Sequence, residues 1–270
     1  MRKLALALAV LLCVGMGASA ARAGDTLAAV KQKGVLVAGV KDSLPPFGYV
    51  DEKTRTLVGY DIDFVKAIAQ RLGVRLELKP VTSASRMPQL SEGNIDLIAA
   101  TMTKTPERAR QIDFSYTYFA TGQKFLVKKG TVKSLKDMAG KKIGTAKGST
   151  SEQNAQKTLP TATVLSFDDY PQAFLALQQG KVFAVTTDES ILAGMLGKAP
   201  NKAQFEIPEL RISEEPYGLG LRKGDAAFLA FVNQSLLEME KSGQARTIYD
   251  KWFGPDSPTP MPRAFSIQPD

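Results

Sequence analysis

The strongest constraint on the fold is a sequence unit that occurs twice. The unit is an amphipathic stretch, a glycine and an apolar run that ends in polar residues; its copies are LSEGNIDLIAAT (90–101) and LQQGKVFAVTTD (177–188). This pattern marks a helix C-cap that leads into a buried strand. Such connectors are common in α/β proteins, but two similar copies predict two similar lobes. Because ligands bind beyond the carboxyl ends of strands in open α/β sheets, Thr101 and Asp188 are expected at a shared cleft.

The rest of the chain continues the alternation of strand and helix patterns. Strands are predicted over 35–40, 74–81, 96–100, 142–145, 182–186 and 217–222, and helices over 60–72, from 105, from 148, and over 170–179, 190–196, 226–239 and 245–252. The predicted fold class is α/β, with helices covering parallel sheets. The proline-rich segment 255–270 is expected to be an extended tail, lying on the surface or frayed.

The N-terminus has the pattern of a secretory signal peptide over residues 1–23. Basic residues at positions 2 and 3 precede an apolar run from Leu4 to Met16, and small residues with A-x-A spacing follow. The run is shorter than the roughly 20 residues that a membrane-spanning helix needs. Cleavage is expected after Ala23 or Ala20. The single cysteine, Cys13, lies in the removed segment, so no disulfide is expected in the mature chain.

The amino-acid composition narrows the range of possible functions. The chain has no histidine, which excludes Ser-His-Asp and Cys-His catalysis and most zinc sites; no metal or cofactor is predicted. The formal charge is +8, and removal of Arg2, Lys3 and Arg22 leaves 32 basic against 27 acidic residues, or +5. This modest excess suits an anionic ligand or solubility and does not indicate nucleic-acid binding.

Arg108 is the first candidate binding residue. It lies in the first turn of a helix that a Thr-Pro pair opens, where the helix dipole disfavours a cation. An anionic partner would explain it, because a guanidinium pairs with a carboxylate through two parallel hydrogen bonds. Thr101 and Thr103 can add donors. The alternative is a solvated arginine paired with a nearby acidic residue.

Four further positions complement Arg108. Ser149 and Thr150 stand at a helix start, where amides and hydroxyls either bind an anion or cap the helix. Asp188 can pair with a ligand ammonium or cap the next helix. Together these groups suit the carboxylate and amine of an α-amino acid. Arg86 has no obvious local acidic partner and is either a surface charge or a second carboxylate ligand.

Motifs along the whole mature chain resemble family 3 periplasmic solute-binding proteins, the amino-acid type that serves ABC transporters. They are PFGY (46–49), LVGYDID (57–63), GNIDL (93–97), TPER (105–108), DFS (113–115), GSTSE (148–152), YG (217–218) and KWF (251–253). The resemblance implies two Rossmann-like lobes joined by a two-strand hinge, the type II periplasmic binding protein fold, with the ligand in the interlobe cleft. Lobe 1 would comprise 24–125 and 217–254 and lobe 2 would comprise 126–216, with crossings near 123–128 and 214–218.

The family pattern implies a role for each residue around the ligand's α-groups. Arg108 would clamp the α-carboxylate, helped by Thr103 and Thr150. Thr101 would accept a hydrogen bond from the α-amine, and Asp188 would pair with it.

The sequence is most similar to the glutamate/aspartate-binding branch, through VTSASRMP (81–88) and DESILAG (188–194). This implies that Ser83 and Arg86 hold a side-chain carboxylate. Lys41 stands where the branch usually has arginine, and Tyr170 where a relative has histidine. Leu44 and Ser83 replace the two aromatics that sandwich the ligand in glutamine and basic-amino-acid binders, which argues against those ligands.

The expected function is therefore capture of L-glutamate or L-aspartate in the periplasm. A monomer would close by hinge motion, dock on an inner-membrane ABC permease and perform no chemistry. The alternatives are a binder of another polar amino acid such as glutamine, or an enzyme resembling cyclohexadienyl dehydratase. Such an enzyme needs a general acid or base in the cleft, and Asp188 is the one carboxylate expected there.

Overall fold

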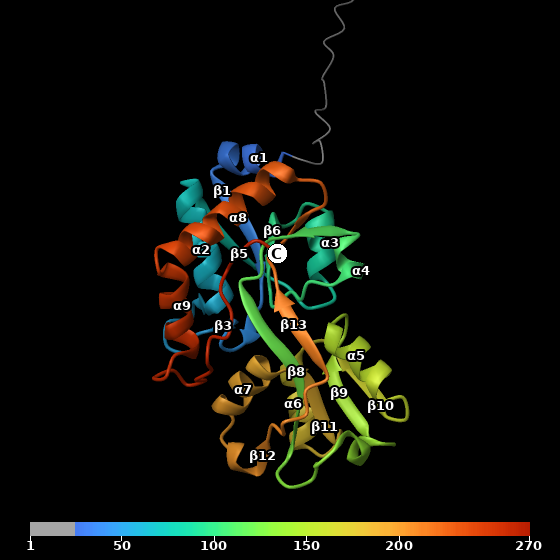
Figure 1. Ribbon diagram of the computed structural model, residues 1–270. Helices are drawn as coiled ribbons and strands as arrows, with labels where there is room; N and C mark the ends of the chain where they lie inside the picture. Colours follow the sequence, from blue (N-terminus) through green and yellow to red (C-terminus); the bar gives the residue numbers. More distant parts are fainter. Residues whose placement is uncertain (1–24) are drawn as a thin grey trace, which may run out of the picture.

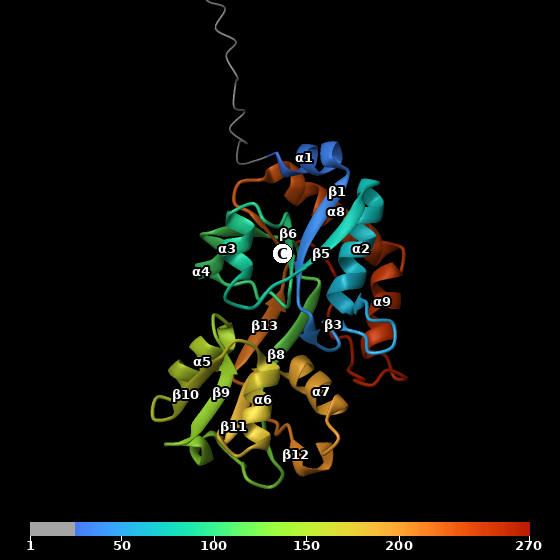
Figure 2. The same ribbon diagram turned by 180° about the vertical axis from the view of Figure 1, so that it is seen from behind.

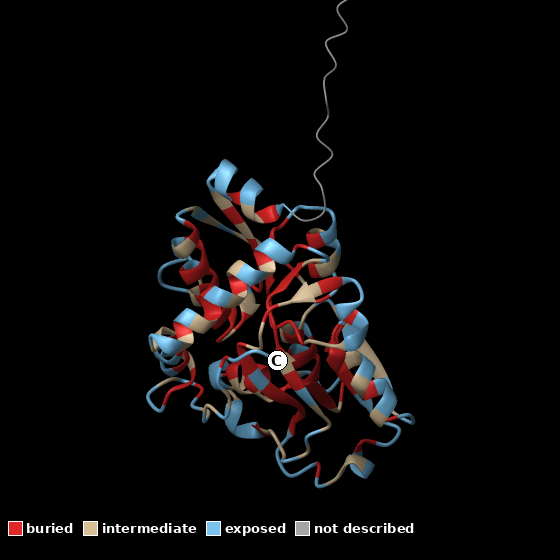
Figure 3. Cartoon of the chain, turned by 45° about the horizontal axis from the view of Figure 1, so that its top comes forward, coloured by how far each residue is buried: buried red, intermediate tan, exposed pale blue. Residues whose placement is uncertain are grey.

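The protein, described by a computed structural model over residues 25–270, has two lobes connected by two long strands (Figure 1). The predicted signal peptide and Cys13 lie outside the described residues. Within residues 25–270, no helix is long and apolar enough to cross a membrane. Buried residues line the sheets and the zone between the lobes, whereas the outer helices alternate buried and exposed faces (Figure 3).

Lobe 1 is built on a five-stranded sheet. The strand order is β5 (Arg75–Pro80), β1 (Val35–Val40), β6 (Leu97–Ala99), β14 (Gly220–Arg222) and β7 (Ile112–Phe114). The first three strands are parallel, and β14 is antiparallel to both of its neighbours. The helices are α1 (Thr26–Lys33), α2 (Tyr60–Leu72), α3 (Arg86–Ser91), α4 (Pro106–Ala109), α8 (Ala226–Lys241) and α9 (Gln244–Phe253). Helix α2 lies on one side of the sheet, and α3 and α4 lie on the other (Figure 2).

A small sheet closes the cleft side of lobe 1, and a second large sheet forms lobe 2. The small sheet has β2 (Ser43–Leu44), β3 (Gly48–Val50) and β4 (Leu57–Val58). The large one runs β10 (Thr163–Phe167), β9 (Lys142–Ala146), β11 (Ala184–Asp188), β8 (Phe119–Lys128) and β12 (Phe205–Glu206), and β13 (Ser213–Tyr217) also pairs with β8. The lobe carries α5 (Thr150–Thr158), α6 (Tyr170–Gln178), α7 (Glu189–Lys198) and two 3₁₀ turns, η1 (Leu135–Met138) and η2 (Lys202–Gln204).

The repeated sequence unit forms the same structure in both lobes. In lobe 1 it is the end of α3, Gly93 and β6; in lobe 2 it is the end of α6, Gly180 and β11. Both glycines are left-handed, with φ of 78° and 70°, a conformation that glycine adopts without the strain that a side chain imposes. The two-lobed α/β fold expected from this repeat is confirmed.

Strands β8 and β13 carry the chain between the lobes as an antiparallel pair. Phe119 pairs with Tyr217 at the lobe 1 end, and Gln123 begins the pairing of β8 with β11 of lobe 2. We propose that lobe 2 starts near Gly122, a few residues before the expected boundary. The prediction of a single strand over 217–222 is wrong. The chain leaves the ladder after Tyr217, where the Gly218 amide bonds to Met102 O (3.0 Å), and β14 starts at Gly220.

Aromatic rings fill the lobe 1 core next to the hinge. Phe47, Tyr60, Phe119, Tyr217 and Phe253 are all at most 1 % exposed, and Phe119 has ring centroids 4.9 Å from both Phe47 and Phe253. Such edge-to-face and tilted pairs stabilise a core beyond the area they bury. The lobe 1 end of the hinge is therefore anchored in a rigid cluster.

The C-terminal tail is extended, as predicted, and it is packed rather than frayed. Arg263 forms a two-point ion pair with Glu240 of α8 (2.9 and 2.5 Å). Phe265 packs edge-on against Phe119, and Ile267 is 3 % exposed. The tail returns to the hinge, where the Asp270 side chain bonds to Lys104 Nζ (2.6 Å).

Candidate functional site

The candidate site lies where the carboxyl ends of β6 and β11 face each other between the lobes, as the sequence predicts. Contacts across this zone are direct. Arg108 Nη2 of lobe 1 donates to Gly148 O of lobe 2 (3.3 Å), and the Thr103 and Thr150 hydroxyls are 3.5 Å apart. The lobes are therefore closed against each other, and the side chains between them are largely removed from water.

Arg108 is buried in the cleft and is not a solvated surface residue. Thr105 caps α4 by accepting from the Arg108 amide (3.2 Å), and Arg108 Nη1 donates to Thr103 O (2.9 Å). The side chain forms no ion pair with a carboxylate among the described residues. Burial lowers the pKa of Arg108 from its ordinary value. Its guanidinium is thus held by main-chain oxygens at the lobe junction.

Asp188 supplies an unpartnered carboxylate oxygen. It precedes α7, but its side chain makes no capping bond. One oxygen, Oδ2, accepts from the Tyr217 hydroxyl of the hinge strand, whereas Oδ1 has no partner and is buried. Burial first, and then the nearby Glu215 carboxylate, raise the pKa of Asp188 to about 8. A positively charged group bound at Oδ1 would favour the ionised form.

Arg86 is also buried, with 2 % of its surface exposed, which excludes the surface-charge alternative. Its Nη1 donates to Ala100 O and to Thr101 O (3.1 Å), and its Nε has no partner. Burial, and then the positive charge of Arg108, lower the pKa of Arg86 to about 9. Within residues 25–270 three buried side-chain N or O atoms lack a partner, and two of them, Arg86 Nε and Asp188 Oδ1, belong to this site.

Thr101 adopts a backbone conformation that is rare for its residue type. Its φ is 48°, in the left-handed region that a β-branched residue avoids. The Thr101 amide donates to Asp61 Oδ2 (3.0 Å), and its carbonyl accepts from Arg86. These two bonds hold the strained backbone and couple it to the cleft.

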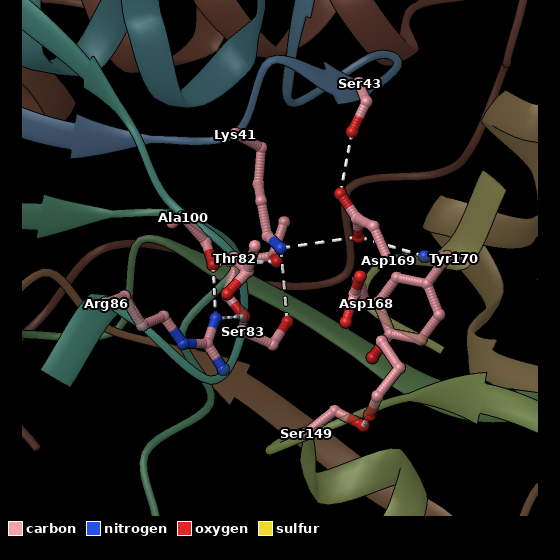
Figure 4. A network of polar contacts seen from close by, with 12 residues as sticks. Lys41, Ser43, Thr82, Ser83, Arg86, Ala100, Ser149, Asp168, Asp169 and Tyr170 are labelled. Carbon is pink, nitrogen blue, oxygen red and sulfur yellow. Dashed lines mark hydrogen bonds and ion pairs between the residues drawn. The ribbon is translucent and has the colours of Figure 1, made fainter. Parts of the chain in front are cut away.

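Lys41 and Ser83 meet at the other end of the cleft (Figure 4). Lys41 is 0 % exposed; its Nζ lies 3.2 Å from Ser83 Oγ and 3.4 Å from Asp169 Oδ1 of lobe 2. Burial lowers the pKa of Lys41 to about 8, against the opposing effect of Asp169. This end of the cleft therefore holds two buried cations, Lys41 and Arg86.

The remaining predicted residues come from lobe 2. Ser149 caps α5 by accepting from the Glu152 amide (3.1 Å) and donates to Ala146 O (2.6 Å), so its hydroxyl is occupied within the lobe. Thr150 donates to the buried Glu215 (2.8 Å). The Tyr170 hydroxyl lies 3.2 Å from Ser151 Oγ. Burial, followed by Asp188, raises the pKa of Tyr170.

Sequence reasoning missed three buried or half-buried carboxylates around the site. Asp61 accepts from the Tyr118 hydroxyl (2.6 Å), Glu215 also accepts from Asn154 Nδ2 (3.0 Å), and Asp169 binds Lys41. Asp169 precedes a Tyr-Pro pair, which is a recognisable helix N-cap signal, but nothing local indicates its contact with lobe 1. Asp61 and Glu215 have no local signal of this kind.

The charged groups of this site are complementary to a small zwitterion. A buried carboxylate oxygen and two guanidiniums in one water-poor zone complement an ammonium and a carboxylate, and such charge-assisted bonds are roughly twice as strong as neutral ones. Among the described residues, no three acidic side chains gather as a metal site requires.

Comparison with known proteins identifies the family. Residues 36–255 match the bacterial extracellular solute-binding proteins, family 3. The chain belongs to this family. The chain is similar to the ABC transporter glutamine-binding protein GlnH of Bacillus subtilis (strain 168), with 41 % identity over 237 residues, 86 % of each chain. The glutamate/aspartate import solute-binding protein of Salmonella typhimurium is 33 % identical over 86 % of this chain and 80 % of its own.

A solved structure shows the same fold. It is an ancestral amino acid-binding protein, a precursor of cyclohexadienyl dehydratase, with a TM-score of 0.76 and 34 % identity over 84 % of this chain and 99 % of the other. This family 3 protein therefore has the type II periplasmic binding protein fold, as its sequence motifs imply.

Proposed function

We propose that the protein captures a free acidic L-amino acid, glutamate or aspartate, and delivers it to an ABC transporter permease. The observation that carries the proposal is the pair of unpartnered buried atoms, Asp188 Oδ1 and Arg86 Nε, on opposite lobes. Buried polar groups are normally satisfied, so these atoms call for a ligand with a cation at one end and an acceptor at the other. Named relatives with transport functions support the same class.

The α-groups of the ligand would occupy the hinge side of the cleft. Arg108 would take the α-carboxylate, with the Thr103 and Thr150 hydroxyls beside it. Asp188 would take the ammonium, with Thr101 at the neighbouring strand end. Residues from both lobes contribute, so binding would favour closure.

Residues at the far end of the cleft favour a ligand with an acidic side chain. Lys41 and Arg86 are both buried there, and the partial partner of Lys41 is Asp169 at 3.4 Å. The nearby Asp61 carboxylate is already bound by Tyr118 and by the Thr101 amide. A ligand carboxylate would bind Arg86 Nε, and Ser83 would add a hydroxyl. A neutral amide would leave more of that positive charge uncompensated.

Glutamine remains the second candidate, because the Bacillus subtilis relative is a glutamine-binding protein at 41 % identity. The replacement of the two sandwiching aromatics by Leu44 and Ser83 argues against glutamine only through the family resemblance, so a direct measurement has to separate the two ligands. Titration calorimetry of the mature protein with glutamate, aspartate, glutamine and arginine decides between them. Tight binding of glutamine with no heat from glutamate would reject the acidic assignment.

Two substitutions test α-carboxylate binding and side-chain binding separately. Arg108→Ala should abolish binding of every amino acid. The matched control is Arg110→Ala, which removes the exposed C-cap arginine of α4, two residues further on, and should bind normally. Arg86→Ala should weaken glutamate far more than glutamine. An equal loss for both ligands would remove Arg86 from side-chain recognition.

We infer further that the protein acts as an exported periplasmic monomer without catalytic activity. The enzyme alternative rests on the structural neighbour that is a dehydratase precursor and on Asp188, whose raised pKa suits a proton donor. Incubation with prephenate tests it directly. Turnover that Asp188→Asn abolishes would establish an enzyme, whereas no turnover with tight amino-acid binding supports the transport role.

A further inference from the structure

Asp169 connects the two lobes at the side-chain end of the cleft. It is the N-cap of α6 in lobe 2, where its Oδ1 accepts from the Tyr170 amide (2.9 Å). Two lobe 1 groups reach the same carboxylate: Ser43 Oγ donates to Oδ2 (2.7 Å), and Lys41 Nζ lies 3.4 Å from Oδ1. Figure 4 shows both contacts converging on Asp169 from lobe 1. One carboxylate is thus shared between a helix cap and two contacts that require closed lobes.

The Lys41 contact is loose for a buried ion pair. Charge-assisted N–H···O bonds normally measure about 2.7–2.9 Å, and the distance here is 3.4 Å. An ammonium has three donors, and Lys41 Nζ uses two of them, toward Asp169 and Ser83. One donor of Lys41 Nζ is left for another acceptor, and the positive charge of Arg86, whose buried Nε has no partner, also acts on Lys41.

Asp169 therefore controls how much positive charge the cleft presents to a ligand side chain. With Asp169 ionised, Lys41 is compensated and Arg86 remains as the free cation. Without that charge, a buried Lys41 would need an anion from the ligand, because an unpaired buried cation is strongly unfavourable.

We propose that Asp169 is a selectivity residue that acts through Lys41: it tempers the preference for acidic over neutral side chains while it helps to hold the lobes closed. The inference deepens the proposed function and rests on it for the ligand class. Asp169 itself need not touch the ligand, so it is a positioning residue.

The test is Asp169→Asn. Asparagine has nearly the same shape and caps helices about as well as aspartate. Its Oδ1 can still accept from the Tyr170 amide, and its Nδ2 can donate to Ser43 Oγ in place of the bond that Asp169 Oδ2 accepts, so the substitution removes mainly the charge. Calorimetry with glutamate and glutamine gives the ratio of their Kd values, Kd(Gln)/Kd(Glu). The ratio should rise at least tenfold over wild type, because glutamine leaves Lys41 unpaired and glutamate does not. A ratio that stays at the wild-type value would overturn the inference.

Two controls separate this effect from general damage. Asp168→Asn alters the exposed neighbouring carboxylate and should leave the ratio unchanged; thermal melting of each variant verifies folding. Lys41→Met should lower the ratio, and Asp169→Asn added to Lys41→Met should not move it further. A persistent tenfold rise in the double variant, or an unchanged ratio for Lys41→Met, contradicts an action through Lys41.

The wild-type ratio Kd(Gln)/Kd(Glu) tests the acidic-ligand assignment, and the change of that ratio in Asp169→Asn tests the role of Asp169. A wild type that prefers glutamine rejects the acidic assignment, whereas a tenfold shift of the ratio toward glutamate in Asp169→Asn still supports the role of Asp169.

Discussion

Gly194 provides the sharpest test of the closed arrangement. It lies in the middle of α7 in lobe 2, against the Pro45–Pro46 segment of lobe 1. A Cβ added there would lie 1.9 Å from Pro45 O and 2.7 Å from Pro45 C. The obstacle is a main-chain carbonyl, which cannot rotate away as a flexible side chain can. Gly194→Ala should therefore keep α7 from seating on lobe 1.

The expected loss of ligand affinity follows from the overlap between the added Cβ and Pro45. Contacts below 3.0 Å essentially never occur for real Cβ atoms, so the lobes must separate locally by about 1 Å or more. Overpacking of this kind costs about 1–3 kcal/mol, and a rigid backbone obstacle places the value near ~3 kcal/mol, or roughly 100-fold in Kd. Alanine is better than glycine in a helix interior by ~1 kcal/mol, so the ligand-free protein should be slightly more stable.

Titration calorimetry and thermal melting measure the two effects separately. Gly197→Ala is the matched control, because it lies on the same helix and its added Cβ meets nothing closer than 3.5 Å. We expect Gly197→Ala to bind normally and Gly194→Ala to bind roughly 100-fold more weakly, with an unchanged or raised melting temperature. Normal ligand affinity in Gly194→Ala would show that binding does not require the observed contact between α7 and Pro45.

Two other predictions follow from the buried charges. The pKa of Asp188 is raised to about 8, with burial as the main cause, so at pH 7 the ligand-free carboxyl is largely protonated and an incoming ammonium should displace the proton. Affinity should therefore increase as the pH rises from 6 to 8, by up to about tenfold per pH unit, and the heat of binding should vary with the ionisation enthalpy of the buffer; buffer-independent heat would contradict this. The Arg263–Glu240 pair anchors the tail, with Arg263 7 % exposed and Glu240 23 % exposed; Arg263→Met should cost ~2 kcal/mol, or roughly 4–8 °C in Tm. Arg246→Met removes the exposed pair with Asp250 and should change Tm by less than about 1–2 °C; equal shifts in the two variants would show that the tail contact does not stabilise the protein.

Local sequence was sufficient to predict most of the helices and strands. Val35–Val40 and Tyr60–Leu72 occupy the predicted ranges, and Thr105 caps α4 as expected. These features depend on side-chain periodicity and on capping residues within a few positions of each other. For the same reason the sequence located Thr101 and Asp188 correctly at the ends of two strands. Strand β8 was recognised only as a crossing, because its pairing partners, β11 and β13, are distant in sequence.

The state of each charged group was decided only by tertiary structure. The sequence left Arg86 open between a surface charge and a carboxylate ligand, and the fold buries it to 2 % exposure with its Nε unpartnered. Tyr217 lies 29 residues from Asp188, and Lys41 lies 128 residues from Asp169. The free energy of a charge depends on which groups exclude water around it and which donors or acceptors reach it. Those groups come from segments that meet only when the lobes close, so the sequence alone determined where a binding cleft would form, and the fold decided which charges in it remain free for a ligand.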